Sequence, residues 1–159
     1  MIFRFKATFD TLKGFMRTYE LRGTNSLYDF HEHIVNDLNF APDQVVMFKV
    51  LDAKGKIQKQ YGLFDLGDGA MDEINIEKLM AQKNIALIYV FNIRDNRALR
   101  LTLLDIDEEL PRKVYPRTSD EKGTPPGQFV DSQNAEAYDD DATEDMIDDD
   151  EINATFDGE

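Results

Sequence analysis

His31 is the residue of this chain best suited to acid–base or metal chemistry. It lies in the stretch 26–40, on the side of a predicted helix that carries the apolar residues, one turn from Leu27 and Val35. A histidine in such a place can carry a proton or bind a metal ion. The alternative, which we favour, is a partly buried histidine with one hydrogen-bond partner. His33 lies toward the polar side of the same helix, where we expect it to be solvated.

A metal site needs several nitrogen, oxygen or sulfur ligands that converge. The two histidines stand at positions i and i+2 of one helix and therefore point apart, and the chain contains no cysteine. The acidic C-terminal stretch does not match an EF-hand loop. Counted from Asp139, its sixth position is Glu144 instead of glycine, and its twelfth is Asp150. The sequence therefore predicts neither a metal site nor a cofactor.

Short motifs of the common enzyme classes are absent from the chain. It contains no GxSxG, Walker A, dinucleotide-type glycine loop or HExxH. The glycine-containing stretch 62–69 does not lead from a strand into a capped helix with a Lys-Ser/Thr pair. These observations favour a noncatalytic protein.

The net charge of −14 is unevenly distributed along the chain. Residues 1–118 contain 17 Lys+Arg and 17 Asp+Glu, whereas residues 119–159 contain one Lys and 15 Asp+Glu. A charge-balanced body does not favour nucleic-acid binding, which depends on a basic surface. Low hydrophobicity and like charge predict a disordered segment from residue 131 onward.

A group of basic residues precedes this acidic segment. Its members are Arg94, Arg97, Arg100, Arg112, Lys113 and Arg117. We interpret Arg94, Arg97 and Arg100 as exposed strand or turn positions. The acidic segment can fold back on the whole group, or it can stay free. Because charges more than about 8 Å apart are largely screened at physiological salt, such docking would be weak.

The helix that positions His31 is the best amphipathic segment of the chain. Leu27, Phe30, Ile34 and Leu38 recur at spacings of three, four and four, which places them on one stripe. Ser26 and the aspartate three residues later are a near-match to a capping box.

Strands are predicted on both sides of this helix. The predicted strands are 2–9, 15–21, 45–51, 56–61, 85–93 and 99–104, and a second helix is predicted over 74–83. The fold class is α+β, with about six mostly antiparallel strands in three hairpins and two helices packed on one face. We expect a globular domain over 1–118, a Pro/Gly-containing linker over 119–130 and an acidic, disordered tail over 131–159.

Several segments resemble the plasmid pRiA4b ORF-3-like family, small bacterial proteins often found near mobile elements. Residues 27–34 match the family's first helix, Leu-x-Asp-Leu-His-x-x-Ile, and Arg17 matches the arginine of its opening hairpin. Residues 115–117 and 123–126 match its Tyr-Pro-Arg and Gly-x-x-Pro-Pro. The resemblance covers roughly residues 2–129.

The family's most specific motif, Tyr-x-Tyr-Asp-Phe-Gly-Asp-x-Trp-x-His, aligns with residues 89–99 without a gap. Tyr89 and Asp95 are kept, whereas Asn92 and Arg97 replace an aspartate and the tryptophan. The final histidine is Leu99, and a second family histidine is replaced by a glutamine at position 44. The resemblance implies chiefly a fold, because no biochemical activity is established for the family.

The matched polar residues define a candidate pocket of Arg17, His31, Tyr89 and Asp95. If the protein is a small enzyme, we expect its site near His31, Tyr89 and Asp95. We expect instead that these residues form no competent site, since the other polar residues of the motif are missing.

Our preferred interpretation is a noncatalytic interaction module whose acidic tail binds a basic protein partner. The candidate anchors in the tail are Met146, Ile147, Ile152 and Phe156. The same tail could instead mimic the charge of nucleic acid, or serve only to keep the protein soluble. The N-terminus does not read as a signal peptide, and no apolar run approaches the roughly 18 residues of a membrane span. We therefore expect a cytoplasmic protein that binds neither membrane nor nucleic acid directly.

Overall fold

Seven antiparallel strands form one sheet, in the order β4-β3-β5-β6-β1-β2-β7. The structure is a computed structural model that describes residues 1–82 and 85–129. The strands are β1 (Ile2–Thr8), β2 (Met16–Arg22), β3 (Met47–Leu51), β4 (Ile57–Gly62), β5 (Ala86–Asn92), β6 (Arg97–Asp107) and β7 (Arg117–Lys122). The helices are α1 (Leu27–Leu38), α2 (Ile76–Met80) and a 3-10 turn, η1 (Met71–Glu73). The mixed α+β class expected from the sequence is confirmed.

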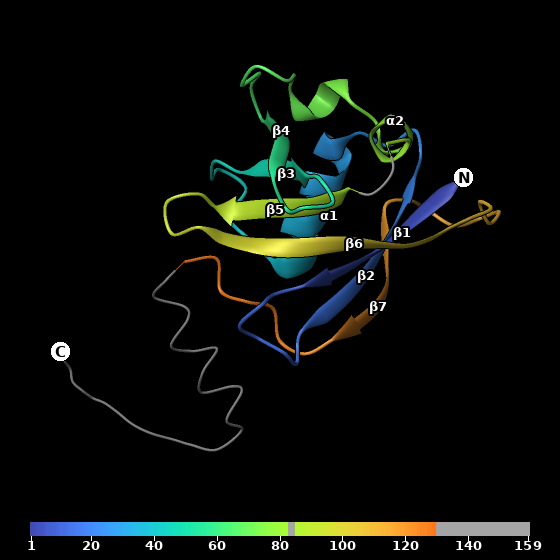
Figure 1. Cartoon of the computed structure of the whole chain (residues 1–159). Helices are drawn as coiled ribbons and strands as arrows, with labels where there is room; N and C mark the ends of the chain where they lie inside the picture. Colours follow the sequence, from blue (N-terminus) through green and yellow to red (C-terminus); the bar gives the residue numbers. More distant parts are fainter. Residues whose placement is uncertain (83–84, 130–159) are drawn as a thin grey trace, which may run out of the picture.

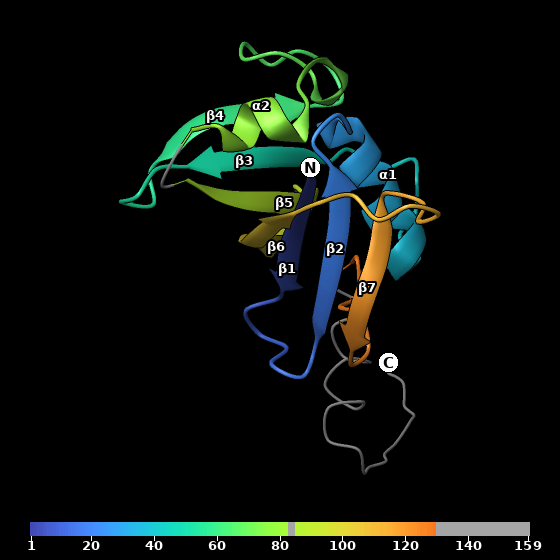
Figure 2. The same ribbon diagram turned by 90° about the vertical axis from the view of Figure 1, so that its right-hand side faces the viewer.

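The sheet is strongly twisted, so its two halves run in different directions. In Figure 2, β3, β4 and β5 cross the view almost horizontally, whereas β1, β2 and β7 run almost vertically. The long strand β6 joins the halves, because it pairs with β5 near its beginning and with β1 along most of its length. In Figure 1, α1 lies across one face of this sheet, and the N-terminus lies beside β1.

The helix α1 forms where the periodicity predicts it. Ser26 caps its first turn, with the Asp29 N–H donating to the Ser26 hydroxyl at 3.0 Å. The Asp29 carboxylate in turn accepts from the Ser26 N–H at 2.9 Å, which completes a capping box. The helix ends at Asn39, whose φ of 59° lies in the left-handed region that asparagine tolerates better than most residues.

Phe30 stands at the centre of the core. Its ring centroid lies 5.2 Å from that of Phe5 on β1, 5.9 Å from Tyr19 on β2 and 5.8 Å from Phe48 on β3. These strands belong to both halves of the sheet, so one helical side chain packs against each half. Ile34, one turn further along the helix, is fully buried.

The prediction of about six strands is wrong, since the sheet has seven. The additional strand, β7, pairs with the outer edge of β2 and places Tyr19 opposite Thr118. It crosses the expected domain boundary at residue 118, so residues 119–122 are strand instead of linker. After β7, the chain runs back beneath the sheet toward the turn between β5 and β6 (Figure 1). The predicted tail, 131–159, lies outside the described residues.

No helix in residues 1–82 or 85–129 is long and apolar enough to cross a membrane.

Candidate functional site

His31 and Tyr89 meet inside the core. Nδ1 of His31 lies 2.8 Å from the hydroxyl oxygen of Tyr89, and both side chains are buried. His31 comes from α1, and Tyr89 comes from the face of β5 that packs against this helix. Burial lowers the pKa of His31 and raises the pKa of Tyr89, so both groups are neutral at pH 7. The pair is therefore a buried histidine satisfied by one partner.

Asp95 lies apart from this pair, in the turn between β5 and β6. Its carboxylate accepts from Nδ2 of Asn92 at 3.1 Å, and its backbone N–H donates to Oδ1 of Asn92 at the same distance. These two bonds close the turn. The two residues thus fix the geometry of the turn, and the structure does not bring Asp95 together with His31.

Arg17 belongs to a different polar group, which joins α1, β2 and β7. We call it the Asp37 cluster. Its members are Arg17, Tyr19, His33, Asp37 and Thr118. Nε of Arg17 lies 3.3 Å from Oδ2 of Asp37, close enough for an ion pair although its N–H is not aligned for a hydrogen bond. Tyr19 donates to the same oxygen at 2.8 Å, and Thr118 donates to the other at 2.9 Å.

His33 completes the cluster through Nε2, which lies 2.8 Å from the Thr118 hydroxyl. Since that hydroxyl gives its only proton to Asp37, it must accept from His33, which places the imidazole proton on Nε2. Burial lowers the pKa of His33, although the nearby Asp37 carboxylate opposes this shift. Burial, and then the same carboxylate, raise the pKa of Tyr19. The carboxylate is therefore surrounded by donors of this chain.

The expectation that His33 is solvated is wrong, because β7 covers the side of α1 on which it lies. Its ring also packs edge-on against Tyr19, with centroids 5.4 Å apart. The sequence offers no signal for this cluster, since Asp37 and Thr118 are 81 residues apart. A polar strand next to a polar helix face has no hydrophobic period that would reveal it.

A third polar group fastens the C-terminal part of the described chain to the body. Nε of Arg97 donates to the backbone oxygen of Gly127 at 2.8 Å. Nδ2 of Asn92 donates to the backbone oxygen of Gln128, also at 2.8 Å. The side-chain oxygen of Gln128 accepts from the backbone N–H of Ala41 at 2.7 Å. Two residues from positions 89–99 thus hold Gly127 and Gln128 in place.

The basic residues that precede the acidic segment do not form one surface. Arg97 is buried, with its guanidinium 5.0 Å from the ring centroid of Phe9. Arg117 forms an ion pair with Glu20, on the face of the sheet away from α1. Arg100 lies 3.9 Å from the carboxylate of Asp10. Since these side chains have different partners in different places, they do not act as a single docking patch.

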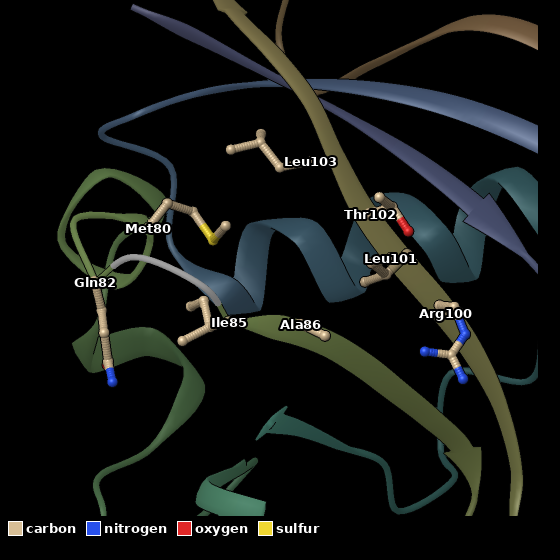
Figure 3. A pocket seen from close by; sticks show the side chains of 8 residues that line it. All are labelled: Met80, Gln82, Ile85, Ala86, Arg100, Leu101, Thr102 and Leu103. Atoms are coloured by element: carbon tan, nitrogen blue, oxygen red, sulfur yellow. The ribbon is translucent and has the colours of Figure 1, made fainter. Parts of the chain in front are cut away.

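Three open hollows on the surface are lined by other residues. One of about 420 Å³ lies where β6 runs past the beginning of β5, with Met80, Gln82 and Ile85 on one side and Leu101 and Leu103 along β6 (Figure 3). Its lining is mainly apolar. A second, of about 740 Å³, lies between the end of α1 and residues 125–129. A third, of about 320 Å³, lies beside the turn after β1. None of these three contains a residue of the candidate pocket.

Over residues 1–82 and 85–129, no group of three or more His, Asp or Glu side chains is arranged to hold a metal ion.

Comparison with known proteins yields a likeness of structure. No family model matches the chain, and no curated protein matches its sequence. Among solved structures, the crystal structure of a protein of unknown function, MM3350 from Methanosarcina mazei Go1, is similar with a TM-score of 0.64. The likeness covers 76% of this chain and 68% of that one, at 15% sequence identity. At this identity it establishes a shared fold and no shared activity.

Two histidines, the buried His31 and the half-buried His33, make the stability of the protein dependent on pH. Both have folded-state pKa values below the ordinary value, whereas the unfolded chain takes up protons below about pH 6.5. The two neutral histidines therefore contribute to the free energy of unfolding above that pH, and this contribution is lost as the pH falls toward their folded-state pKa values. At pH 5.5, one unit below the ordinary value, the loss is at most about 1.4 kcal/mol per histidine.

Urea titrations at pH 7.5 and 5.5 would measure this loss, and His31→Gln/His33→Gln should reduce it. The carboxylate of Glu20 does not interfere. Burial raises its pKa, but Arg117 and Arg4 outweigh burial and lower it, so its contribution is lost only below its ordinary range. A wild-type free energy of unfolding that stays constant or rises on acidification would contradict the prediction.

Proposed function

We propose that this protein is a noncatalytic interaction module that presents its acidic C-terminal segment to a basic protein partner. The observation that carries the proposal is the way residues 127 and 128 are held against the domain. Arg97 and Asn92 donate to the backbone at Gly127 and Gln128, so the acidic segment starts from a fixed point on the domain. Residues 131–159 then carry 13 acidic side chains and no Lys or Arg.

The polar residues of the body support this function over the enzyme alternative. His31 and Tyr89 are buried and bonded to each other, and Asp95 is used in a turn. Asp37 accepts from donors of the same chain. A catalytic group must reach a substrate, and these groups are occupied within the fold.

The same contacts favour membership of the plasmid pRiA4b ORF-3-like family, which we propose on the matched residues. His31 and Tyr89 come from two separate motifs of the resemblance and pair with each other. Arg97 and Asn92, which replace the tryptophan and an aspartate of the second motif, lie at motif positions that contact the stretch following the Gly-x-x-Pro-Pro match. Motifs far apart in the sequence thus contact one another in the fold.

The proposed partner carries a basic surface, which an acidic segment meets through charge and through scattered apolar side chains. Charge complementarity increases the rate of association and orients the partners, while apolar anchors slow dissociation. A DNA-binding protein is one such partner, because the acidic segment would then occupy the surface that otherwise binds phosphates.

The test uses the full-length protein as bait and measures the Kd of the captured partner. Replacement of Ile147, Ile152 and Phe156 by Ser should raise the Kd at least about tenfold, since anchoring side chains each contribute about 1–2 kcal/mol. Higher salt should weaken binding, because exposed charges are screened. The matched control replaces three exposed apolar residues of the folded domain by Ser, namely Val45, Leu110 and Val114. Binding that ignores both salt and the substitutions in the acidic segment would assign the function to the folded domain instead.

A further inference from the structure

The hairpin of β3 and β4 carries a dense group of positive charges. Residues 49–59, which we call the lysine hairpin, contain four lysines and one aspartate, a net charge of +3. The lysines are Lys49, Lys54, Lys56 and Lys59. The last three are exposed, and within the described part of the chain none of the four forms an ion pair. In Figure 2 the turn of this hairpin projects from the body at the left.

The one aspartate of the hairpin is engaged in shaping its turn. Oδ1 of Asp52 accepts from the backbone N–H groups of Lys54 and Lys56, both at 2.9 Å. Gly55, between them, has a φ of +83°, which suits glycine at this position. The backbone thus turns sharply between Lys54 and Lys56, and the aspartate serves this turn.

The hairpin also forms one end of the sheet. β4 is an edge strand of the sheet. Over 56–59, no other strand of the described chain lies along its outer side. Further along, the N–H of Gln60 donates to the Asp68 carboxylate at 3.0 Å, which covers that position. An extended segment laid beside 56–59 would gain backbone hydrogen bonds as well as charge contacts. Ile57, 47% exposed, offers it an apolar contact.

Lysines on an edge strand also discourage pairing with the edges of other sheets. This role alone would explain the lysines without any segment bound to them. What points to an occupant is the complementary charge on the same chain. Residues 139–151 are acidic at nine of 13 positions, with Met146 and Ile147 between the acidic runs. The lysine hairpin has four lysines within eleven residues, none of them in an ion pair with the described part of the chain. Residues 139–151 have the densest negative charge of the sequence.

The acidic stretch starts at a suitable distance from the hairpin. Residue 128 is fixed near the end of β5, at Asn92, whereas the hairpin turn follows Leu51, which pairs with Ala86 at the other end of β5. Seven residues of strand and two strand spacings separate these places, about 23 Å and about 10 Å. A flexible chain of 10–22 residues spans about 18–26 Å on average. A chain of this length is therefore long enough to bring residues 139–151 to the hairpin.

We propose that residues 139–151 dock on the lysine hairpin of the same chain in the free protein. This goes beyond the interaction function proposed above, because it identifies a resting place for the acidic segment that an external partner would have to displace. The contact is electrostatic and sits at the surface, so it is dynamic and sensitive to salt.

The test exploits the absence of cysteine from the chain. Ala142→Cys introduces one thiol in the acidic stretch of the full-length protein, to which a nitroxide spin label is attached. In low salt, the amide NMR signals of residues 54–59 should lose at least about half of their intensity, and added salt should restore them as screening increases. Lys54→Glu/Lys56→Glu/Lys59→Glu should abolish the loss.

The matched control reverses three other exposed positive charges, Lys13→Glu/Lys78→Glu/Arg94→Glu, and should leave the loss at 54–59 unchanged. Two outcomes would overturn the proposal directly. These are intact signals at 54–59 in low salt, and a loss that persists when the hairpin charges are reversed. A third is a loss seen equally when isotope-labelled protein is mixed with spin-labelled, unenriched protein, because the acidic segment of a second copy would then be the occupant.

Discussion

Ile34→Ala is expected to lower the free energy of unfolding by about 2–5 kcal/mol. Ile34 is fully buried on α1, on the same side as Phe30. Removing three of its carbon atoms loses their burial and leaves a cavity, because aromatic rings fixed on several strands cannot all move in to fill it. The loss would be measured by denaturant titration at pH 7.5.

Asn36→Ala is the matched control, since Asn36 is exposed on the opposite side of the same helix. Alanine is the better helix former, so this variant should change the free energy of unfolding by no more than about 0.5 kcal/mol. If Ile34→Ala were also neutral, α1 could not be the element on which the core is built.

Asp37→Ala is expected to cost about 3 kcal/mol or more. The variant removes the acceptor of Tyr19 and Thr118 and leaves the buried guanidinium of Arg17 without its counter-charge. Breaking a buried ion pair by removing one partner costs on the order of 3–5 kcal/mol, because an uncompensated charge remains. Arg17 keeps its bonds to backbone oxygens at the end of β7, which places the cost toward the lower end of that range.

Amide hydrogen exchange would show whether Asp37→Ala loosens β7 in particular or destabilises the whole domain. Amide exchange should accelerate in β7 more than in β1 or β5, because the Asp37 cluster ties β7 to α1. Arg17→Met/Asp37→Leu removes both charges and should be less destabilising than Asp37→Ala. Asp43→Ala, at an exposed position, serves as the control and should be nearly neutral. Equal exchange in all strands would show that the cluster does not anchor β7.

The elements that sequence reasoning located are those whose signals are local. The stripe of α1, the capping box at Ser26 and the alternation of β1 each depend on residues a few positions apart. β7 was missed because Arg117–Lys122 has no apolar alternation, as is typical of a polar edge strand. The contact of β7 with the flank of α1 then changes the environment of His33 from solvent to protein.

The structure brings together only two of the four residues proposed for the candidate pocket. His31 and Tyr89 do meet, because α1 crosses the face of β5 on which Tyr89 lies. The other two residues separate for simple geometric reasons. Asp95 falls beyond the end of β5, and Arg17 lies near the beginning of β2, next to the last turn of α1. Sequence spacing does not indicate at which height along a helix a strand residue will pack.

The position of β1 in the sheet determines when this protein can fold during its synthesis. Among the described strands β1 leaves the ribosome first, yet it lies between β2 and β6, and Ile2 pairs with Asp107. Until β6 has been made, the hairpin of β1 and β2 lacks its neighbour on one side. Such distant pairing is associated with slow folding. The nascent chain therefore carries an open edge on β1 until β6 has been made, and an unpaired strand edge in that period favours aggregation.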